Sequence, residues 1–245
     1  LFLYLLNWGV GAVSEMLSMP IVARIRSEFP TKFGIPRQSG LVEELQAEVI
    51  FEPRYRNPDA LRGLEEFSHL WLIWYFSQAD RSSWSPTVRP PRLGGNERMG
   101  VFATRSPFRP SPIGLSAVKL LGIERHLELG PVLRVSGADL MDGTPILDIK
   151  PYLPYGDCIS EASGGFTDRR IRALLTVKIP DELLNRVPEE RRAALKGVLA
   201  NDPRPPYHSD PTRIYGMAFA GMEVRFSVSD GILLVQDIIV GDKER

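Results

Sequence analysis

The run Phe67-Ser-His-Leu-Trp-Leu-Ile-Trp-Tyr-Phe76 is aromatic or aliphatic at eight of its ten positions. It is too short to cross a bilayer, because a membrane helix needs about 20 apolar residues. A short continuous apolar run is typical of a central β-strand, and we expect this one to be buried on both faces. His69, inside the run, is then expected to be a hydrogen-bonded core residue rather than a catalyst.

Shorter strands are predicted on both sides of this run. Apolar and polar residues alternate over Ile21–Arg26, which indicates a half-buried strand. The other expected strands are Ala47–Glu52, Met99–Thr104, Leu115–Ile123, Val132–Val135 and Ile146–Ile149. A helical turn is predicted over Pro58–Glu66, with Asn57 as its cap. Because the strands follow one another with only turn residues between them, the pattern favours a mainly β unit, either an antiparallel sandwich or a closed barrel.

The composition changes after about residue 165, and a smaller α+β unit is predicted there. A strand over Ala173–Ile179 precedes a helix that starts at Pro188. Ala194, Leu195, Val198 and Leu199 share one apolar face of that helix, and the closing strands are expected at Ile214–Phe219, Val224–Val228 and Ile232–Val240. The predicted domains are therefore 19–165 and 166–245. Residues 1–18 are expected to be an upstream extension, with the natural start near Met16 or Met19.

Charge in this chain is concentrated locally. Lys plus Arg and Asp plus Glu both number 30, which excludes a whole-molecule basic field for nucleic acid. Between residues 81 and 112, however, six arginines and one glutamate give a local charge of +5, and Trp84, Phe102 and Phe108 are interleaved with them. Prolines stiffen this loop. Arginines with aromatic residues are typical of single-stranded RNA recognition. The alternative is a solvated loop whose arginines pair with acids elsewhere.

The remaining motifs limit the possible chemistry. The chain has neither the dinucleotide fingerprint Gly-x-Gly-x-x-Gly nor a phosphate loop, which disfavours an ordinary Rossmann site. It also has no nucleophile elbow, which disfavours a hydrolase. Cys158 is the only cysteine, and Asp139, Asp142 and Asp148 have no histidine nearby, so we expect no metal. Asp142 precedes Gly143 and is either an Asx-turn residue or a ligand-facing carboxylate. The loop Arg37-Gln38-Ser39-Gly40 allows a ligand close to its backbone.

Several long strings, taken in order, carry a family resemblance. They are Lys32-Phe-Gly-Ile-Pro-Arg-Gln-Ser-Gly-Leu41, Leu61-Arg-Gly-Leu-Glu-Glu-Phe-Ser-His-Leu-Trp71, Val88-Arg-Pro-Pro-Arg-Leu-Gly-Gly-Asn96, Met99-Gly-Val-Phe-Ala-Thr-Arg-Ser-Pro-Phe-Arg-Pro110, Pro112-Ile-Gly-Leu-Ser116 and Asp142-Gly-Thr-Pro-Ile-Leu-Asp-Ile-Lys-Pro-Tyr-Leu-Pro154. Together they resemble the TrmO family of tRNA (adenine(37)-N6)-methyltransferases. The resemblance runs from about Met19 to the C-terminus. It is thin beyond residue 165, apart from Asp202-Pro-Arg-Pro205 and Tyr207.

The resemblance implies a fold, a reaction and a cofactor site. The fold would be a single-sheeted β-barrel with a smaller C-terminal domain, in a cytoplasmic homodimer. S-adenosylmethionine would donate a methyl group to N6 of threonylcarbamoyladenosine, beside the anticodon of tRNA. The implied cofactor-binding residues are Ser39, Gly40, Leu41, Ser77, Gln78, Arg105, Leu115, Ser136, Gly137, Ala138 and Asp139. The family often has His-Gln where this chain has Ser77-Gln78.

Roles follow from charge and position. Asp139 or Asp142 would hold the cofactor or accept the N6 proton, and Arg105 would pair with a carboxylate of the cofactor or of the threonyl group. The anticodon loop would be bound through Arg89, Arg92, Arg98, Arg109, Arg204 and Tyr207. Two rival hypotheses are a non-catalytic tRNA-binding barrel and a methyltransferase for another acceptor. No membrane partner is expected.

Overall fold

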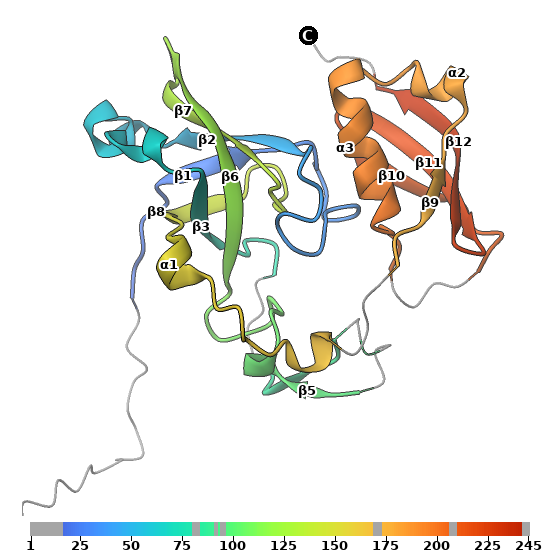
Figure 1. Cartoon of the computed structure of the whole chain (residues 1–245), viewed down its shortest axis with the longest axis horizontal. Helices are drawn as coiled ribbons and strands as arrows, with labels where there is room; N and C mark the ends of the chain where they lie inside the picture. The colour runs from blue at the N-terminus through green and yellow to red at the C-terminus, as the bar shows by residue number, and fades with distance from the viewer. Residues whose placement is uncertain are drawn as a thin grey trace, which may run out of the picture.

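The computed structural model describes residues 17–79, 84–90, 93, 97–168, 173–205 and 210–241. Nearly all of the expected extension 1–18 lies outside these residues. The described chain is mainly β, as expected, and its C-terminal part forms a separate sheet (Figure 1). No helix in the described part of the chain has the length and apolar character needed to cross a membrane.

Six strands of the N-terminal part close into one barrel in the order β1-β2-β7-β6-β3-β8. The strands are β1 (Ala23–Arg26), β2 (Gln46–Phe51), β3 (His69–Tyr75), β6 (Ile113–His126), β7 (Gly130–Ser136) and β8 (Pro145–Pro151). Every pair is antiparallel. Because successive side chains of a strand point to opposite faces, alternate residues such as Leu70, Leu72 and Trp74 fill the interior.

The expectation that the 67–76 run is buried on both faces is wrong. A closed barrel has one interior, so Trp71, Ile73 and Tyr75 of β3 point outward and are only partly buried. The Trp71 ring packs on Tyr152 with 5.4 Å between centroids. His69 is exposed rather than in the core, and its Nδ1 lies 2.9 Å from the Ser68 hydroxyl.

The barrel connections contain short elements. They are η1 (Pro53–Tyr55), η2 (Pro58–Leu61), η3 (Leu64–Glu66), β4 (Thr87–Val88), β5 (Met99–Gly100), η5 (Val101–Ala103), α1 (Pro154–Asp157) and η6 (Gly165–Thr167). The predicted Asn57 cap is confirmed, since its side chain accepts a hydrogen bond from the Asp59 amide. The predicted strand over Met99–Thr104 ends at Gly100, because the Thr104 hydroxyl and amide both bond to the Val101 carbonyl and close a turn.

The C-terminal sheet has the order β10-β11-β12-β9. Its elements are β9 (Thr176–Lys178), α2 (Asp181–Leu184), α3 (Glu189–Ala200), β10 (Tyr215–Phe219), β11 (Met222–Ser229) and β12 (Ile232–Val240). The predicted apolar face of α3 is confirmed, since Ala194, Leu195, Val198 and Leu199 are all buried. The strand expected over Ala173–Ile179 is shorter, and it pairs in parallel with β12.

The connection from β1 to β2, residues 27–45, joins the two parts. It leaves the barrel and reaches toward α3 and β10 (Figure 1). Phe29, Val42 and Leu45 of this connection are buried in the same apolar cluster as α3 and the C-terminal sheet. The barrel interior forms a second cluster of its own. The C-terminal core is therefore completed by a segment of the N-terminal part.

Candidate active site

Asp139 lies just beyond the end of β7, at the end of a short hydrogen-bonded relay. The buried Trp74 ring of β3 donates from Nε1 to the Ser116 hydroxyl at 2.9 Å. Ser116 of β6 in turn donates to Asp139 Oδ1 at 2.6 Å. Gly114 leaves the space that the Trp74 ring fills, since a Cβ there would lie 2.3 Å from the ring. Two strands of the barrel, β3 and β6, thus orient a carboxylate that lies just after a third, β7.

The surroundings of Asp139 change its acidity. Partial burial raises the pKa of its carboxyl, because loss of water disfavours the charged form. The Ser116 hydroxyl, the Ser39 backbone and the Arg105 guanidinium oppose this by stabilising the carboxylate. A carboxyl whose pKa is raised toward neutrality is better suited to accept a proton than an ordinary aspartate.

The loop before β2 meets the segment after β7 through two glycines. The Gly40 amide donates to the Gly137 carbonyl at 2.9 Å, and the Gly137 amide donates to the Leu45 carbonyl at 2.8 Å. Both glycines have positive φ, and a Cβ on Gly137 would press within 3.3 Å of the Gly40 backbone. Gly40 is exposed, with no atom within 4 Å of where its own Cβ would stand. A ligand can therefore approach the Gly40 backbone closely.

Arg105 brings the cationic loop to the same place. Its Nη1 donates to Gln38 Oε1, which joins the 81–112 loop to the Gln38-Ser39-Gly40 segment. Arg105 remains exposed beside the Asp139 carboxylate. Of the sequence-predicted residues, the structure therefore brings together Ser39, Gly40, Arg105, Gly137 and Asp139.

Other predicted cofactor residues lie around this cluster in different settings. Ser136 and Ala138 flank Gly137 and are buried. Leu41 is exposed beside Gly40, and Ser77 and Gln78 are exposed just after β3. The Leu115 side chain is half exposed on the outer face of β6, opposite to the inward Ser116.

The Asp142 carboxylate, unlike that of Asp139, is hydrogen-bonded to the start of the 27–45 connection. Its Oδ1 accepts a 2.9 Å hydrogen bond from the Ser27 amide, and its own amide donates to the Phe29 carbonyl. It lines a shallow hollow beside Arg24 and Arg26 of β1. This geometry corresponds to the turn interpretation of Asp142, in which the carboxylate fixes the start of the 27–45 connection.

The predicted RNA-binding arginines also differ in their surroundings. Arg89 and Arg98 are exposed, whereas Arg109 donates to the Val101 and Thr104 carbonyls and braces its own loop. Arg204 forms a two-pronged ion pair with the buried Asp202. Arg92 and Tyr207 lie outside the described residues.

Two exposed aromatic residues stand on the cationic loop beside these arginines. Trp84 is 53% exposed and Phe102 76% exposed, and their ring centroids are 6.4 Å apart. The backbone holds them together, because Thr87 pairs with Gly100 and the Val101 amide donates to the Pro86 carbonyl. The interleaving seen in the sequence therefore becomes one aromatic surface in space.

Sequence reasoning did not assign a functional role to Trp74 or Ser116. Ser116 carried a signal, because it is a polar residue at an inward position of an alternating strand. A fully buried hydroxyl needs a hydrogen-bond partner, and that partner is the Asp139 carboxylate.

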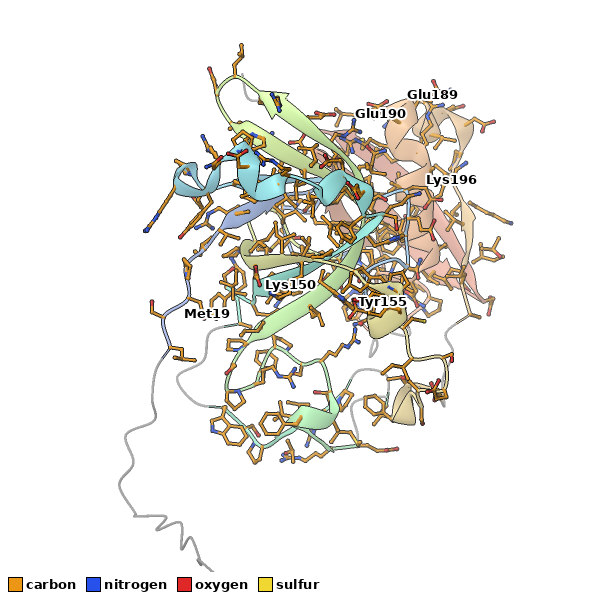
Figure 2. All side chains as sticks on the ribbon, turned by 60° about the vertical axis from the view of Figure 1, so that its left-hand side comes forward. Met19, Lys150, Tyr155, Glu189, Glu190 and Lys196 are labelled. Atoms are coloured by element: carbon orange, nitrogen blue, oxygen red, sulfur yellow. The ribbon has the colours of Figure 1, made fainter. Side chains whose placement is uncertain are left out.

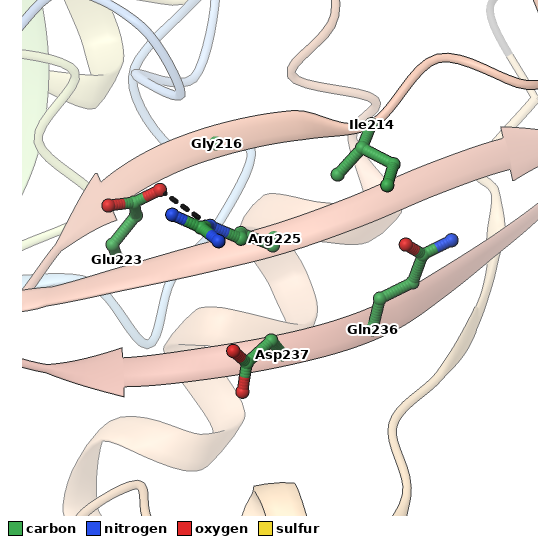
Figure 3. A pocket seen from close by; sticks show the side chains of 6 residues that line it. All are labelled: Ile214, Gly216, Glu223, Arg225, Gln236 and Asp237. Carbon is green, nitrogen blue, oxygen red and sulfur yellow. Dashed lines mark hydrogen bonds and ion pairs between the residues drawn. The ribbon is translucent and has the colours of Figure 1, made fainter.

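A hollow on the C-terminal sheet lies apart from these residues. Its lining consists of Ile214, Gly216, Glu223, Arg225, Gln236 and Asp237 (Figure 3). Arg225 Nε and Glu223 Oε1 form a 2.9 Å ion pair in it. No residue predicted to be functional is among these six. Within the part of the chain that the structure describes, no three His, Cys, Asp or Glu side chains are grouped to hold a metal ion.

Comparisons with known proteins cover both parts of the chain. Residues 24–158 match the model of the tRNA-methyltransferase O N-terminal domain, and residues 172–240 match the TrmO C-terminal domain. A tRNA (adenine(37)-N6)-methyltransferase of Escherichia coli K12 is 42% identical over 214 residues, which is 84% of this chain and 91% of that protein. One of Eikenella corrodens is 46% identical over 174 residues, covering 71% and 97%. A crystal structure of TrmO from Pseudomonas aeruginosa superposes with a TM-score of 0.72 at 33% identity, covering 91% and 99%.

Proposed function

The chain belongs to the TrmO family, and from this premise we propose that it transfers a methyl group from S-adenosylmethionine to N6 of adenosine 37 in tRNA. We propose further that the acceptor is the threonylcarbamoyl form of that adenosine. The observation that carries the proposal is that Asp139, Arg105 and the hydrogen-bonded backbones of Gly40 and Gly137 lie close together.

The residues at this place fit S-adenosylmethionine. Its amino-acid end carries a carboxylate, and the exposed Arg105 guanidinium supplies the opposite charge. The open side of Gly40 admits a ligand against the backbone. When bound, the cofactor supplies a methyl group on a positively charged sulfur. Ser39, Gly40, Gly137 and Arg105 would hold it.

Asp139 would accept the proton in the reaction. The bound cofactor would supply the methyl group that replaces the N6 proton, and the Asp139 carboxylate would take up that proton. The Trp74–Ser116 relay keeps that carboxylate in one orientation, which lowers the entropic cost of reaching the reacting geometry. Arg105 would pair with the threonyl carboxylate or with that of the cofactor.

The cationic loop would bind the anticodon loop. Arg89 and Arg98 are exposed and would contact phosphates, and the Trp84–Phe102 surface would offer stacking for unpaired bases. We also propose that the chain forms a homodimer and works in the cytoplasm. Its two domains would be residues 19–165 and 166–245. Light scattering of the purified chain tests the dimer.

The decisive experiment combines the purified chain with S-adenosylmethionine and tRNA, followed by mass spectrometry of the digested nucleosides. A methylated threonylcarbamoyladenosine is expected, with Asp139→Asn as the matched inactive variant. tRNA that lacks the threonylcarbamoyl group is the acceptor control. Methylation of that control tRNA instead would point to another acceptor. tRNA binding without any affinity for S-adenosylmethionine would favour a non-catalytic binding protein.

A further inference from the structure

The 27–45 connection is anchored at its start by the C-terminal unit. The buried Phe29 ring meets Phe219 of β10 edge-on, with 5.6 Å between centroids. The Ala220 amide donates to the Glu28 carbonyl at 3.0 Å. The Glu28 carboxylate forms an ion pair with Arg191 of α3. These contacts join the connection to a strand, a turn and a helix of the other unit.

The later part of the 27–45 connection also packs closely against the C-terminal unit. At Gly34, a Cβ would lie 2.4 Å from Met217 Sδ, so the backbone lies directly against β10. At Gly197 of α3, a Cβ would lie 2.6 Å from Val42 Cγ1. Glycine inside a helix costs about 1 kcal/mol relative to alanine. The glycine in the middle of α3 therefore allows Val42 to pack against the helix backbone.

Between these anchors the connection turns toward the candidate active site. Gln38 accepts from Arg105, the Ser39 backbone bonds to Asp139, and Gly40 bonds to the Gly137 carbonyl. Gly40 and Val42 are separated by a single residue, and the carbonyl of that residue, Leu41, accepts from Asn201 at the end of α3. A shift of Val42 on α3 must therefore displace the Gly40 backbone.

We propose that α3 and β10 act as a positioning support for residues 37–41, so that the C-terminal unit sets the affinity of the barrel for its methyl donor. Val42 and Gly197 are the positioning residues, since neither contacts the candidate active site and both fix the segment that does. The inference rests on the proposed function for the identity of the ligand. The mechanical coupling itself rests only on the contacts above.

Gly197→Ala tests the coupling. Alanine favours the helix, but its Cβ would overlap the buried Val42 and push it away, so a merely structural role predicts lower or unchanged thermal stability with unchanged ligand affinity. We expect instead that S-adenosylmethionine binds about tenfold more weakly in calorimetric titrations without tRNA. Hydrogen–deuterium exchange in a peptide spanning residues 37–43 is expected to become faster.

The double variant Val42→Ala/Gly197→Ala removes the clash, and we expect it to regain most of the lost affinity. Lys196→Ala is the matched control, because Lys196 is exposed on the same helix (Figure 2). Parental affinity together with parental exchange in Gly197→Ala would overturn the inference. If the parental chain bound no S-adenosylmethionine, the proposed function would fail, while the exchange comparison would still decide whether the units are coupled.

Discussion

The Ser116 hydroxyl and the Asp139 carboxylate are joined by a 2.6 Å hydrogen bond. Ser116 is fully buried and receives a hydrogen bond from the Trp74 ring, so its own proton is directed at the carboxylate. This hydrogen bond lowers the pKa of Asp139, whereas burial raises it. The acidity of the proposed base is therefore set by the balance of two opposing effects, and each can be altered separately.

Ser116→Ala is expected to raise the pKa of Asp139 further, because the carboxylate loses a donor. Asp139 accepts a proton only when ionised, so the acidic limb of the kcat/KM profile should move to higher pH. Leaving the Trp74 N–H without a partner should also lower the free energy of unfolding by about 1–3 kcal/mol. The exposed Ser229→Ala is the control. An acidic limb at the parental pH would show that Ser116 does not tune the base.

Asp139→Asn is expected to abolish methyl transfer while stabilising the fold at neutral pH. A folded-state pKa above the ordinary value of 3.8 means that the folded state favours the protonated acid. The stability from this group is present below pH 3.8 and is lost as the pH rises through the raised pKa. Asparagine does not titrate, so the variant should gain stability relative to the parent across that window. Denaturant titrations at pH 3.5 and 7.5 measure the difference, and an equal difference at both would contradict the shift.

Some of the fold follows directly from local pattern. The helix α3 was predictable because its apolar residues recur at helical spacing, and the strand β12 because seven of its nine residues are aliphatic. Alternation also identified which residues of β1 face the core. It could not decide between a sandwich and a barrel, because alternation shows which face is buried but not which strands pair. The strand predicted over Met99–Thr104 was too long, because alternation did not show that pairing with Thr87 and Val88 stops at Gly100, where the Thr104–Val101 hydrogen bonds close a turn.

The candidate active site was predictable only in part, and for a similar reason. The cofactor roles of Ser39, Gly40 and Asp139 were named from the family resemblance. These residues are far apart in the sequence and meet because β2 pairs with β7. Asp142 is close to Asp139 in sequence, yet its carboxylate is held by the amide of Ser27, which follows β1. Proximity along the chain therefore did not indicate a shared site.

Phe102→Ala and Trp84→Ala are each expected to weaken tRNA binding by about tenfold, because stacking contributes roughly 1–3 kcal/mol per base. Affinity for S-adenosylmethionine should be unchanged, since neither ring contacts Asp139 or Arg105. Filter binding with the modified tRNA measures the first effect and calorimetry the second. Leu127→Ala is the matched control, because Leu127 is a fully exposed apolar side chain on the distant β6–β7 turn. Parental tRNA affinity in both aromatic variants would rule out the stacking surface.

Substitutions at Arg204 and Arg89 should distinguish an arginine that stabilises the fold from one that binds RNA. Arg204 pairs through Nε and Nη2 with Asp202, whose side chain is 4% exposed. Removing one partner of a buried ion pair leaves the other charge poorly solvated, so Arg204→Ala should lower the free energy of unfolding by about 3 kcal/mol. Its effect on tRNA affinity should be small while the chain stays folded.

Arg89→Ala should do the reverse. Arg89 is exposed on the cationic loop, so its loss should leave stability unchanged and reduce the slope of log affinity against log salt by about 1. Thermal unfolding and tRNA titrations at several salt concentrations give both quantities for each variant. An unchanged salt slope in Arg89→Ala would remove that residue from the RNA surface. If Arg204→Ala instead lowered the salt slope and kept normal stability, the Arg204 guanidinium would contact a phosphate. Its ion pair with Asp202 would then open when tRNA binds.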